Sequence, residues 1–274
     1  MCDVCVINAV KERMLSRRAF FKSGLTAGAA VAAASTFGAT TSAMAAGHGG
    51  VTDMTHAYDD AFPTYFGVPG IKADQQFKFA DNGFNLFQLT INEHTGTHVD
   101  APLHFSADGL SVDQIPVSDL VVPLCVIHIH EKAANDADAQ VTPDDLKAYI
   151  AKFGPIPDKA CVAMHSGWAG KTGTDGFRNV GSDEKMHFPG FHVEAAKMLL
   201  EETTAAAIAV DTLSLDHGPS ADFATHYAWL PANRYGIECL AGLEKVPASG
   251  ATLVVGAPTH RGGSGGPARI FAMV

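Results

Sequence analysis

Side chains that could bind a metal ion gather in one short segment of the chain, residues 94–104. His94, His98, Asp100 and His104 offer three imidazoles and a carboxylate, a ligand set that suits zinc, manganese or iron(II). A single histidine is more often a core or surface residue than a ligand. Four such side chains at this spacing favour metal binding and, through a water on the metal, hydrolytic chemistry.

The conformation of this segment decides whether its side chains can share an ion. In a straight strand, His94 and His98 would lie about 13 Å apart at ~3.3 Å per residue, which is too far. A helix is disfavoured because Gly96 is a poor helix former and Pro102 would break it. We therefore expect a bend at Gly96, with His98 and Asp100 on one side of an extended stretch.

The elements that must position this segment follow two alternating patterns. Apolar runs of strand length, bounded by Gly, Pro or Asp, cover residues 84–91, 121–129, 160–165, 206–211 and 251–257. Helical patterns cover residues 142–153, 193–202 and 234–243. The first of these opens with Thr142 as a cap and Pro143 in the first turn. Strands that alternate with helices predict an α/β domain with a mostly buried sheet.

The pattern His-x-Gly-Thr-His-x-Asp-x-Pro-x-His-Phe at residues 94–105 resembles the signature of the cyclase family, which includes bacterial kynurenine formamidases and isatin hydrolases. The likeness extends over roughly residues 51–274 and includes several further segments. They are residues 53–56, 166–171, 188–191, 210–216 and 262–269. The resemblance implies a single domain in which helices flank a mixed, partly barrel-like β-sheet.

The resemblance also implies a metal centre with one or two ions, Zn²⁺ or Mn²⁺. His94, His98 and Asp100 match the family's first ligands, and Asp100 could bridge two ions. In the family a later histidine and a glutamate complete the second position, and His226 and Glu238 match that pair here. A continuous helix would place these two residues about 18 Å apart, so the chain must break between them.

For function, the resemblance implies a metal-dependent hydrolase of carbon–nitrogen bonds other than peptide bonds. It would be similar to an arylformamidase, which converts N-formylkynurenine to kynurenine and formate. His104 matches the family's acid/base residue, and an unperturbed imidazole pKa of about 6.5 suits proton transfer to a departing nitrogen. The alternatives are isatin hydrolase-like opening of a cyclic amide, hydrolysis of an ester or lactone, and a metal-dependent binding protein without turnover.

We expect a small aromatic substrate, and Trp168, Phe191 and His165 are the candidates to contact it. For Trp168 and Phe191, packing in the core is an equally good interpretation. We also expect a homodimer or homotetramer. The roles of four further polar residues stay open, namely His56, His187, Asp211 and Asp216.

The first 45 residues have the pattern of an export signal. Arg17 and Arg18, followed by a weakly apolar run, are similar to a twin-arginine signal, and residues 43–45 (Ala-Met-Ala) form a cleavage pattern. The sequence therefore predicts a signal peptide at 1–45 that is cleaved, a hydrolase domain at 46–274, recognition by the twin-arginine export machinery and a periplasmic location. An uncleaved anchor or a flexible tail is the alternative. The run is less hydrophobic than a membrane-spanning helix, so no stable membrane span is expected.

The composition excludes several classes of protein. The net charge of −10 argues against a nucleic-acid partner, because phosphate binding needs a basic surface. A hydrophobic content of 47% excludes a fully disordered chain. Beyond the predicted signal, Cys125, Cys161 and Cys239 are too few for a disulfide framework, and we expect Cys125 to be a small buried hydrophobic residue.

Overall fold

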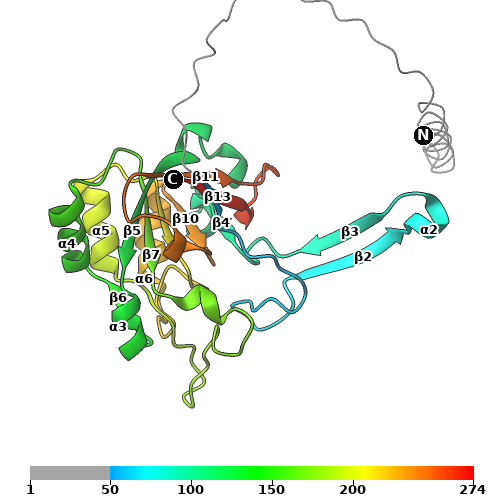
Figure 1. Ribbon diagram of the computed structural model, residues 1–274, viewed down its shortest axis with the longest axis horizontal. Coiled ribbons are helices and arrows are strands. Elements are labelled where there is room, and N and C mark those ends of the chain that lie inside the picture. Colours follow the sequence, from blue (N-terminus) through cyan, green and yellow to red (C-terminus); the bar gives the residue numbers. More distant parts are fainter. Residues whose placement is uncertain (1–49) are drawn as a thin grey trace, which may run out of the picture. The chain divides into compact units, whose positions relative to one another are not determined.

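The computed structural model describes residues 50–274 of the chain (Figure 1). The predicted signal peptide at 1–45 lies outside the described residues and stays a prediction. The strands are β1 Val51–Asp53, β2 Ile71–Phe77, β3 Leu86–Ile91, β4 His98–Asp100, β5 Val121–His128, β6 Gln140–Val141, β7 Cys161–His165, β8 Gly190–Phe191, β9 Ala207–Val210, β10 Tyr235–Glu238, β11 Ala251–Gly256, β12 Gly265–Pro267 and β13 Arg269–Met273. The α-helices are α2 Phe79–Asn82, α3 His130–Asn135, α4 Pro143–Phe153, α5 Val193–Glu202 and α6 Ala224–Trp229.

One large sheet contains most of these strands, in the order β1-β13-β11-β5-β7-β9-β10-β4-β12. The central strands β5, β7, β9 and β10 run parallel to one another, whereas the pairs on either side of them are antiparallel. The predicted α/β fold with a mixed, partly barrel-like sheet is therefore confirmed. Strand β4, which carries two of the candidate ligands, lies between β10 and β12.

The parallel strands are buried on both faces. On β5, Leu124 and Val126 belong to one hydrophobic core, while Cys125 and Ile127 belong to a second core on the other face. Helices α4 and α5 pack on the second core, to which α4 contributes Leu146, and they lie together on one side of the sheet (Figure 1). Such strands read as continuous apolar runs rather than alternating patterns, which is what the sequence contains.

Local signals explain where α4 begins and ends. The backbone N–H of Thr142 donates to the Asp145 carboxylate at 2.8 Å, and Pro143 takes the first helical position, where no N–H is needed. Gly154 follows the helix with φ of 93°, a conformation that a side chain would disfavour. Helices α4 and α5 confirm the first two predicted helices.

The third predicted helix, at 234–243, is wrong. Residues Tyr235–Glu238 form strand β10, in which all four residues are buried. Helix α6 ends at Trp229, and Asn233, with φ of 57°, turns the chain into β10. The expected break between His226 and Glu238 is thus confirmed, and it brings Glu238 onto the strand beside β4.

Residues Ala73–Thr90 form a separate compact unit. In it β2 pairs with β3, and the connection runs through α2 to Gly83, which adopts φ of 79°. The rings of Phe77 and Phe84 lie 5.0 Å apart across this connection.

Two further expectations from the sequence concern the cysteines and membrane-spanning helices. Cys125, Cys161 and Cys239 are free, buried thiols, which confirms the expectation for Cys125. Among residues 50–274, no helix combines the length and the apolar character needed to cross a membrane.

Candidate metal centre

The segment that carries the candidate ligands turns at Gly96 and then enters the sheet as β4. Gly96 adopts φ of 65°, a left-handed conformation that glycine reaches without steric cost. An added Cβ there would also lie only 2.9 Å from the ring of Tyr58. His98 and Asp100 are two residues apart on β4, so their side chains point to the same face. The predicted bend and the shared side are confirmed.

Glycine faces Asp100 on both neighbouring strands. Gly236 of β10 and Gly265 of β12 are its partners across the sheet. A Cβ on Gly236 would lie 3.3 Å from Asp100 Oδ2 and 2.8 Å from Leu215 Cδ1, and a Cβ on Gly265 would overlap the Val99 carbonyl oxygen. The two glycines therefore leave room for a carboxylate between three strands.

The two oxygens of the Asp100 carboxylate face different histidines. Oδ1 lies 2.7 Å from His94 Nδ1 and 3.3 Å from His98 Nε2. Oδ2 lies 3.7 Å from His226 Nε2. The side chain of Asp100 is fully buried. One carboxylate thus stands at the centre of three imidazoles that come from two distant parts of the sequence.

Glu238, on the neighbouring strand β10, contacts two of these imidazoles. It is paired with His98 across β10 and β4, and its Oε2 lies 3.3 Å from His98 Nε2. Its Oε1 lies 3.2 Å from His226 Nε2 and accepts a hydrogen bond of 2.9 Å from the backbone N–H of Leu215. The structure therefore brings together all five residues that the sequence predicted as ligands.

Hydrogen bonds on the far side of the rings determine which nitrogen of each histidine faces the carboxylates. His98 Nδ1 lies 2.8 Å from the Gly96 carbonyl oxygen, to which it can only donate. His226 Nδ1 lies 2.6 Å from Asp216 Oδ2, and Asp216 is itself held by the backbone N–H of Thr225. With Nδ1 carrying the proton, Nε2 of each neutral ring presents a lone pair to the centre, as a metal ligand does.

The donor set fits a divalent metal ion. His98 Nε2 and Asp100 Oδ2 are buried without a hydrogen-bond partner, although such atoms are normally satisfied. Among residues 50–274, no lysine or arginine forms an ion pair with Asp100 or Glu238. Burial lowers the pKa of His98, but the close contacts of its Nε2 with the Asp100 and Glu238 carboxylates outweigh this and raise the pKa to about 10. The two carboxylates therefore require a positive charge between them, which either a proton or a metal ion can supply.

His104 lies beside this centre but does not share the contacts that join the other histidines to Asp100 and Glu238. It lies in the 3₁₀ turn Pro102–Phe105 after β4, and its ring stacks on that of His94 with centroids 3.9 Å apart. A ring nitrogen of His104 lies within 4.8 Å of ligand atoms of His94 and Asp100. Burial lowers its pKa to about 4, so the ring is neutral near pH 7. The unperturbed value assumed from the sequence does not hold here.

The sequence did not point to two residues that hold His94. Ser264, in the glycine-rich C-terminal segment, places its Oγ 3.1 Å from His94 Nε2. The Ser264 hydroxyl and backbone N–H both donate to Glu93, whose other carboxylate oxygen lies 2.6 Å from His260 Nε2. The only signals in the sequence are the position of Glu93 beside His94 and the glycine-rich run at residues 262–266. Neither indicates a contact between residues about 170 positions apart.

A cavity of about 40 Å³ opens onto His94, His98 and Glu238. Its remaining wall comes mainly from residues 63–70, and Leu213 and Cys239 also line it. Loop residues of this kind commonly set the selectivity of a site.

The three residues proposed from the sequence as substrate contacts lie elsewhere. Trp168 is buried in a core cluster with Phe177, to whose carbonyl oxygen its indole N–H donates at 2.8 Å. Phe191 is buried in the core beneath α5. His165 lies at the end of β7, beside His128. Because the indole and phenyl rings are 2% and 1% exposed, core packing is the interpretation that the structure supports for both.

Enlarging Gly236 tests whether the position of Asp100 matters. We expect Gly236→Ala to weaken metal binding by about 10–100-fold, the range found when groups that orient a ligand are lost, because the new methyl group would press on Leu215 and on the Asp100 carboxylate. Metal content per chain is the measurement. Gly170→Ala is the matched control, since a Cβ there would meet nothing within 4 Å. Equal behaviour of the two variants would contradict the prediction.

Known proteins resemble this chain in sequence and in structure. The family described as "Putative cyclase" matches residues 52–217. An isatin hydrolase from Roseibium aggregatum is 30% identical over 195 residues, which cover 68% of this chain and 73% of that protein. Isatin hydrolase A from Ralstonia solanacearum has a similar structure, with a TM-score of 0.77 and 32% identity over 88% of this chain and 99% of that one. A predicted metal-dependent hydrolase from Bacillus stearothermophilus, at 23% identity and a TM-score of 0.62 over 81% of this chain and 97% of that one, shares the fold.

Proposed function

Because this chain belongs to the cyclase family, we propose that it hydrolyses an amide bond attached to an aromatic ring, with a divalent metal ion as its cofactor. One observation carries the proposal. Asp100 is fully buried, yet each of its oxygens faces a different group of imidazoles, and Glu238 faces two of the same rings. Such convergence of acidic and neutral donors is unfavourable unless a cation is present.

Five side chains would hold the metal, whether Zn²⁺ or Mn²⁺. His94 and His98 face Asp100 Oδ1, while His226 faces Asp100 Oδ2 and Glu238, so the carboxylate could serve one ion or bridge two. When bound, the metal would supply a Lewis acid that polarises the substrate carbonyl and lowers the pKa of a water. The protein's contribution is to place the proton of each neutral ring on Nδ1, through Gly96 and Asp216, so that Nε2 of His98 and His226 is the nitrogen that would face the metal.

The proton required by the leaving nitrogen would pass through His104. Its neutral ring can accept a proton from the attacking water and then donate that proton to the amine as the carbon–nitrogen bond breaks. The stacking on His94 holds the His104 ring within reach of the centre. Ser264 contacts His94 Nε2 and is itself hydrogen-bonded to Glu93. These contacts restrain the ring of His94 and, through the stacking, the ring of His104.

For the substrate, we propose a cyclic aryl amide of the isatin type, and the names of the relatives support this choice. Hydrolysis would open the ring, and the new carboxylate and the aryl amine would remain in one molecule. An N-formyl arylamine undergoes the same chemistry and releases formate. The reaction at the carbonyl is identical in the two cases, and the loop at 63–70 is the part of the site that would distinguish them.

A panel of substrates tests this proposal. Protein supplied with Zn²⁺ or Mn²⁺ is assayed for kcat/KM on isatin, N-formylkynurenine and simple aryl esters. We expect the highest value on isatin, because the relatives that resemble this chain in sequence and structure carry that activity in their names. Turnover of N-formylkynurenine alone would establish the formamidase alternative. Metal bound at the centre without turnover of any substrate would contradict a hydrolase and favour a binding protein.

Export by the twin-arginine pathway, a periplasmic location and a homo-oligomeric state are further proposals that rest on the sequence alone. A test is to express the full chain in a bacterium and follow it in cell fractions, with Arg17→Lys and Arg18→Lys introduced together as the comparison. We expect the wild-type chain in the periplasmic fraction and the double variant inside the cell.

A further inference from the structure

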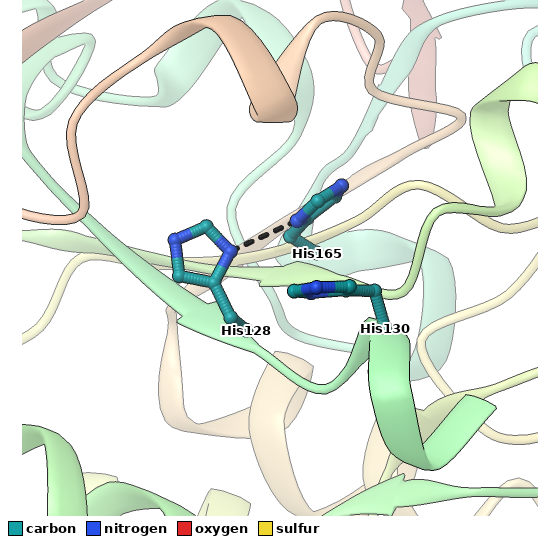
Figure 2. Close-up of side chains that lie close together, drawn as sticks. All are labelled: His128, His130 and His165. Atoms are coloured by element: carbon teal, nitrogen blue, oxygen red, sulfur yellow. Dashed lines mark hydrogen bonds between the residues drawn. The ribbon is translucent and has the colours of Figure 1, made fainter. Parts of the chain in front are cut away.

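Three histidines that are not part of the candidate metal centre converge at one edge of the sheet (Figure 2). His128 ends β5 and His165 ends β7, and the register of these parallel strands pairs the two residues directly. His130 begins α3, two residues after β5 ends. The ends of adjacent parallel strands, together with the helix that follows one of them, therefore bring three imidazoles together from two parts of the chain.

The rings are close enough to bind a common ion. His128 Nδ1 lies 2.9 Å from His165 Nδ1, and one ring nitrogen of each histidine lies within 4.8 Å of those of the other two. The ring of His130 is tilted by 34° from that of His165, with their centroids 5.1 Å apart. In Figure 2 the three rings form a triangle around a common space, and the dashed line marks the contact between His128 and His165.

The lowered pKa values of His128 and His165 favour metal binding. Burial, followed by the nearby His128 and His130, lowers the pKa of His165 to about 4. Burial likewise lowers the pKa of His128. Among residues 50–274, none of the three rings forms an ion pair with a carboxylate that would stabilise an imidazolium. Neutral imidazoles have a free lone pair, and this is the form that binds a metal.

We propose that His128, His130 and His165 form a second metal site, which binds one divalent transition ion of the zinc or copper class. In a tetrahedral zinc site with bonds of 2.0–2.1 Å, ligand nitrogens are about 3.3 Å apart. The His128–His165 nitrogens therefore need to separate by a few tenths of an ångström from 2.9 Å, and His130 needs to move closer. His128 and His130 are exposed and can make this adjustment, which leaves the fourth position to water.

The chemistry of the donors defines the class of ion. All three ligands are imidazoles, which suit zinc, copper and nickel, whereas Mg²⁺, Ca²⁺ and Mn²⁺ prefer carboxylate, carbonyl and water oxygens. The candidate centre around Asp100 differs because it contains two carboxylates. We therefore expect the three-histidine site to favour Cu²⁺ over Mn²⁺ more strongly than the centre around Asp100 does. Without an ion, the contact between His128 and His165 is a hydrogen bond from one neutral ring to the other.

The test counts metal ions in protein whose main centre has been disabled. In an Asp100→Asn background, the protein is incubated with Cu²⁺, desalted and analysed for copper per chain and by electron paramagnetic resonance. We expect one ion per chain with coupling to several nitrogens. Adding His128→Gln and His130→Gln should remove that ion, and because both side chains are exposed these changes leave the core intact. His217→Gln in the same background is the control.

Two results would overturn the second site. One is a copper content that is the same with and without His128→Gln and His130→Gln, because the ion would then be bound elsewhere. The other is a nitrogen coupling that these substitutions leave unchanged. The outcome is independent of the proposed hydrolase, since the background lacks a ligand of the main centre. With Asp100 intact, the His128→Gln and His130→Gln variant should keep its hydrolytic activity.

Discussion

Replacing Asp100 with asparagine is expected to remove the metal ion and to lower kcat/KM by more than about 100-fold. Loss of a group that merely orients a ligand already costs about 10–100-fold, and Asp100 contacts three of the candidate ligands directly. Asparagine keeps the shape of the side chain but has no negative charge and only one oxygen. It therefore cannot present an acceptor oxygen both to His94 and His98 and to His226, as the two oxygens of Asp100 do.

Metal content per chain, measured together with kcat/KM, checks this expectation. Asp108→Asn makes the same chemical change at an exposed position and should alter neither quantity. Thermal unfolding of the metal-free variants separates loss of the ion from loss of the fold. An Asp100→Asn protein that kept a full complement of metal and its activity would show that the ion binds elsewhere, and the proposed centre would then be wrong.

The part of the site that could be predicted from the sequence is the part encoded locally. The bend at Gly96, the shared side of His98 and Asp100, and the cap that starts α4 at Thr142 each depend on residues a few positions apart. Gly96 and the cap act through their own backbone conformation and hydrogen bonds, so a single sequence contains enough information. The identity of His226 and Glu238 came instead from the likeness to a family.

What could not be predicted depends on the tertiary fold. Strand β10 alternates, with Tyr235 and Ile237 in the hydrophobic core and Glu238 at the metal centre, but four residues are too few for this alternation to distinguish a strand from a helix in the sequence. The contact of Ser264 with Glu93 joins two segments that only the pairing of β12 with β4 brings together. For Trp168, no feature of the sequence distinguishes an indole ring that packs in the core from one that lines a site.

Replacing His104 with glutamine is expected to lower kcat on an amide substrate by about 10²–10⁴-fold, the usual contribution of a positioned acid/base group. The metal should remain bound, because the contacts among Asp100, His98 and Glu238 do not involve His104. Glutamine can form hydrogen bonds but cannot take a proton from water and deliver it to nitrogen. The measurements are kcat with isatin or N-formylkynurenine and the metal content of the same samples.

The leaving group separates proton transfer from a merely structural role of His104. An aryl amide must gain a proton as the carbon–nitrogen bond breaks, whereas an activated ester such as a nitrophenyl ester releases a stable anion. The loss caused by His104→Gln should therefore be much smaller on the ester than on the amide, while His217→Gln should change neither rate. Equal losses on both substrates would contradict proton donation to the amine and would limit His104 to taking the proton of the attacking water or to supporting the ring of His94, on which it stacks. A loss confined to the amide would place the proton on His104 as the amine departs.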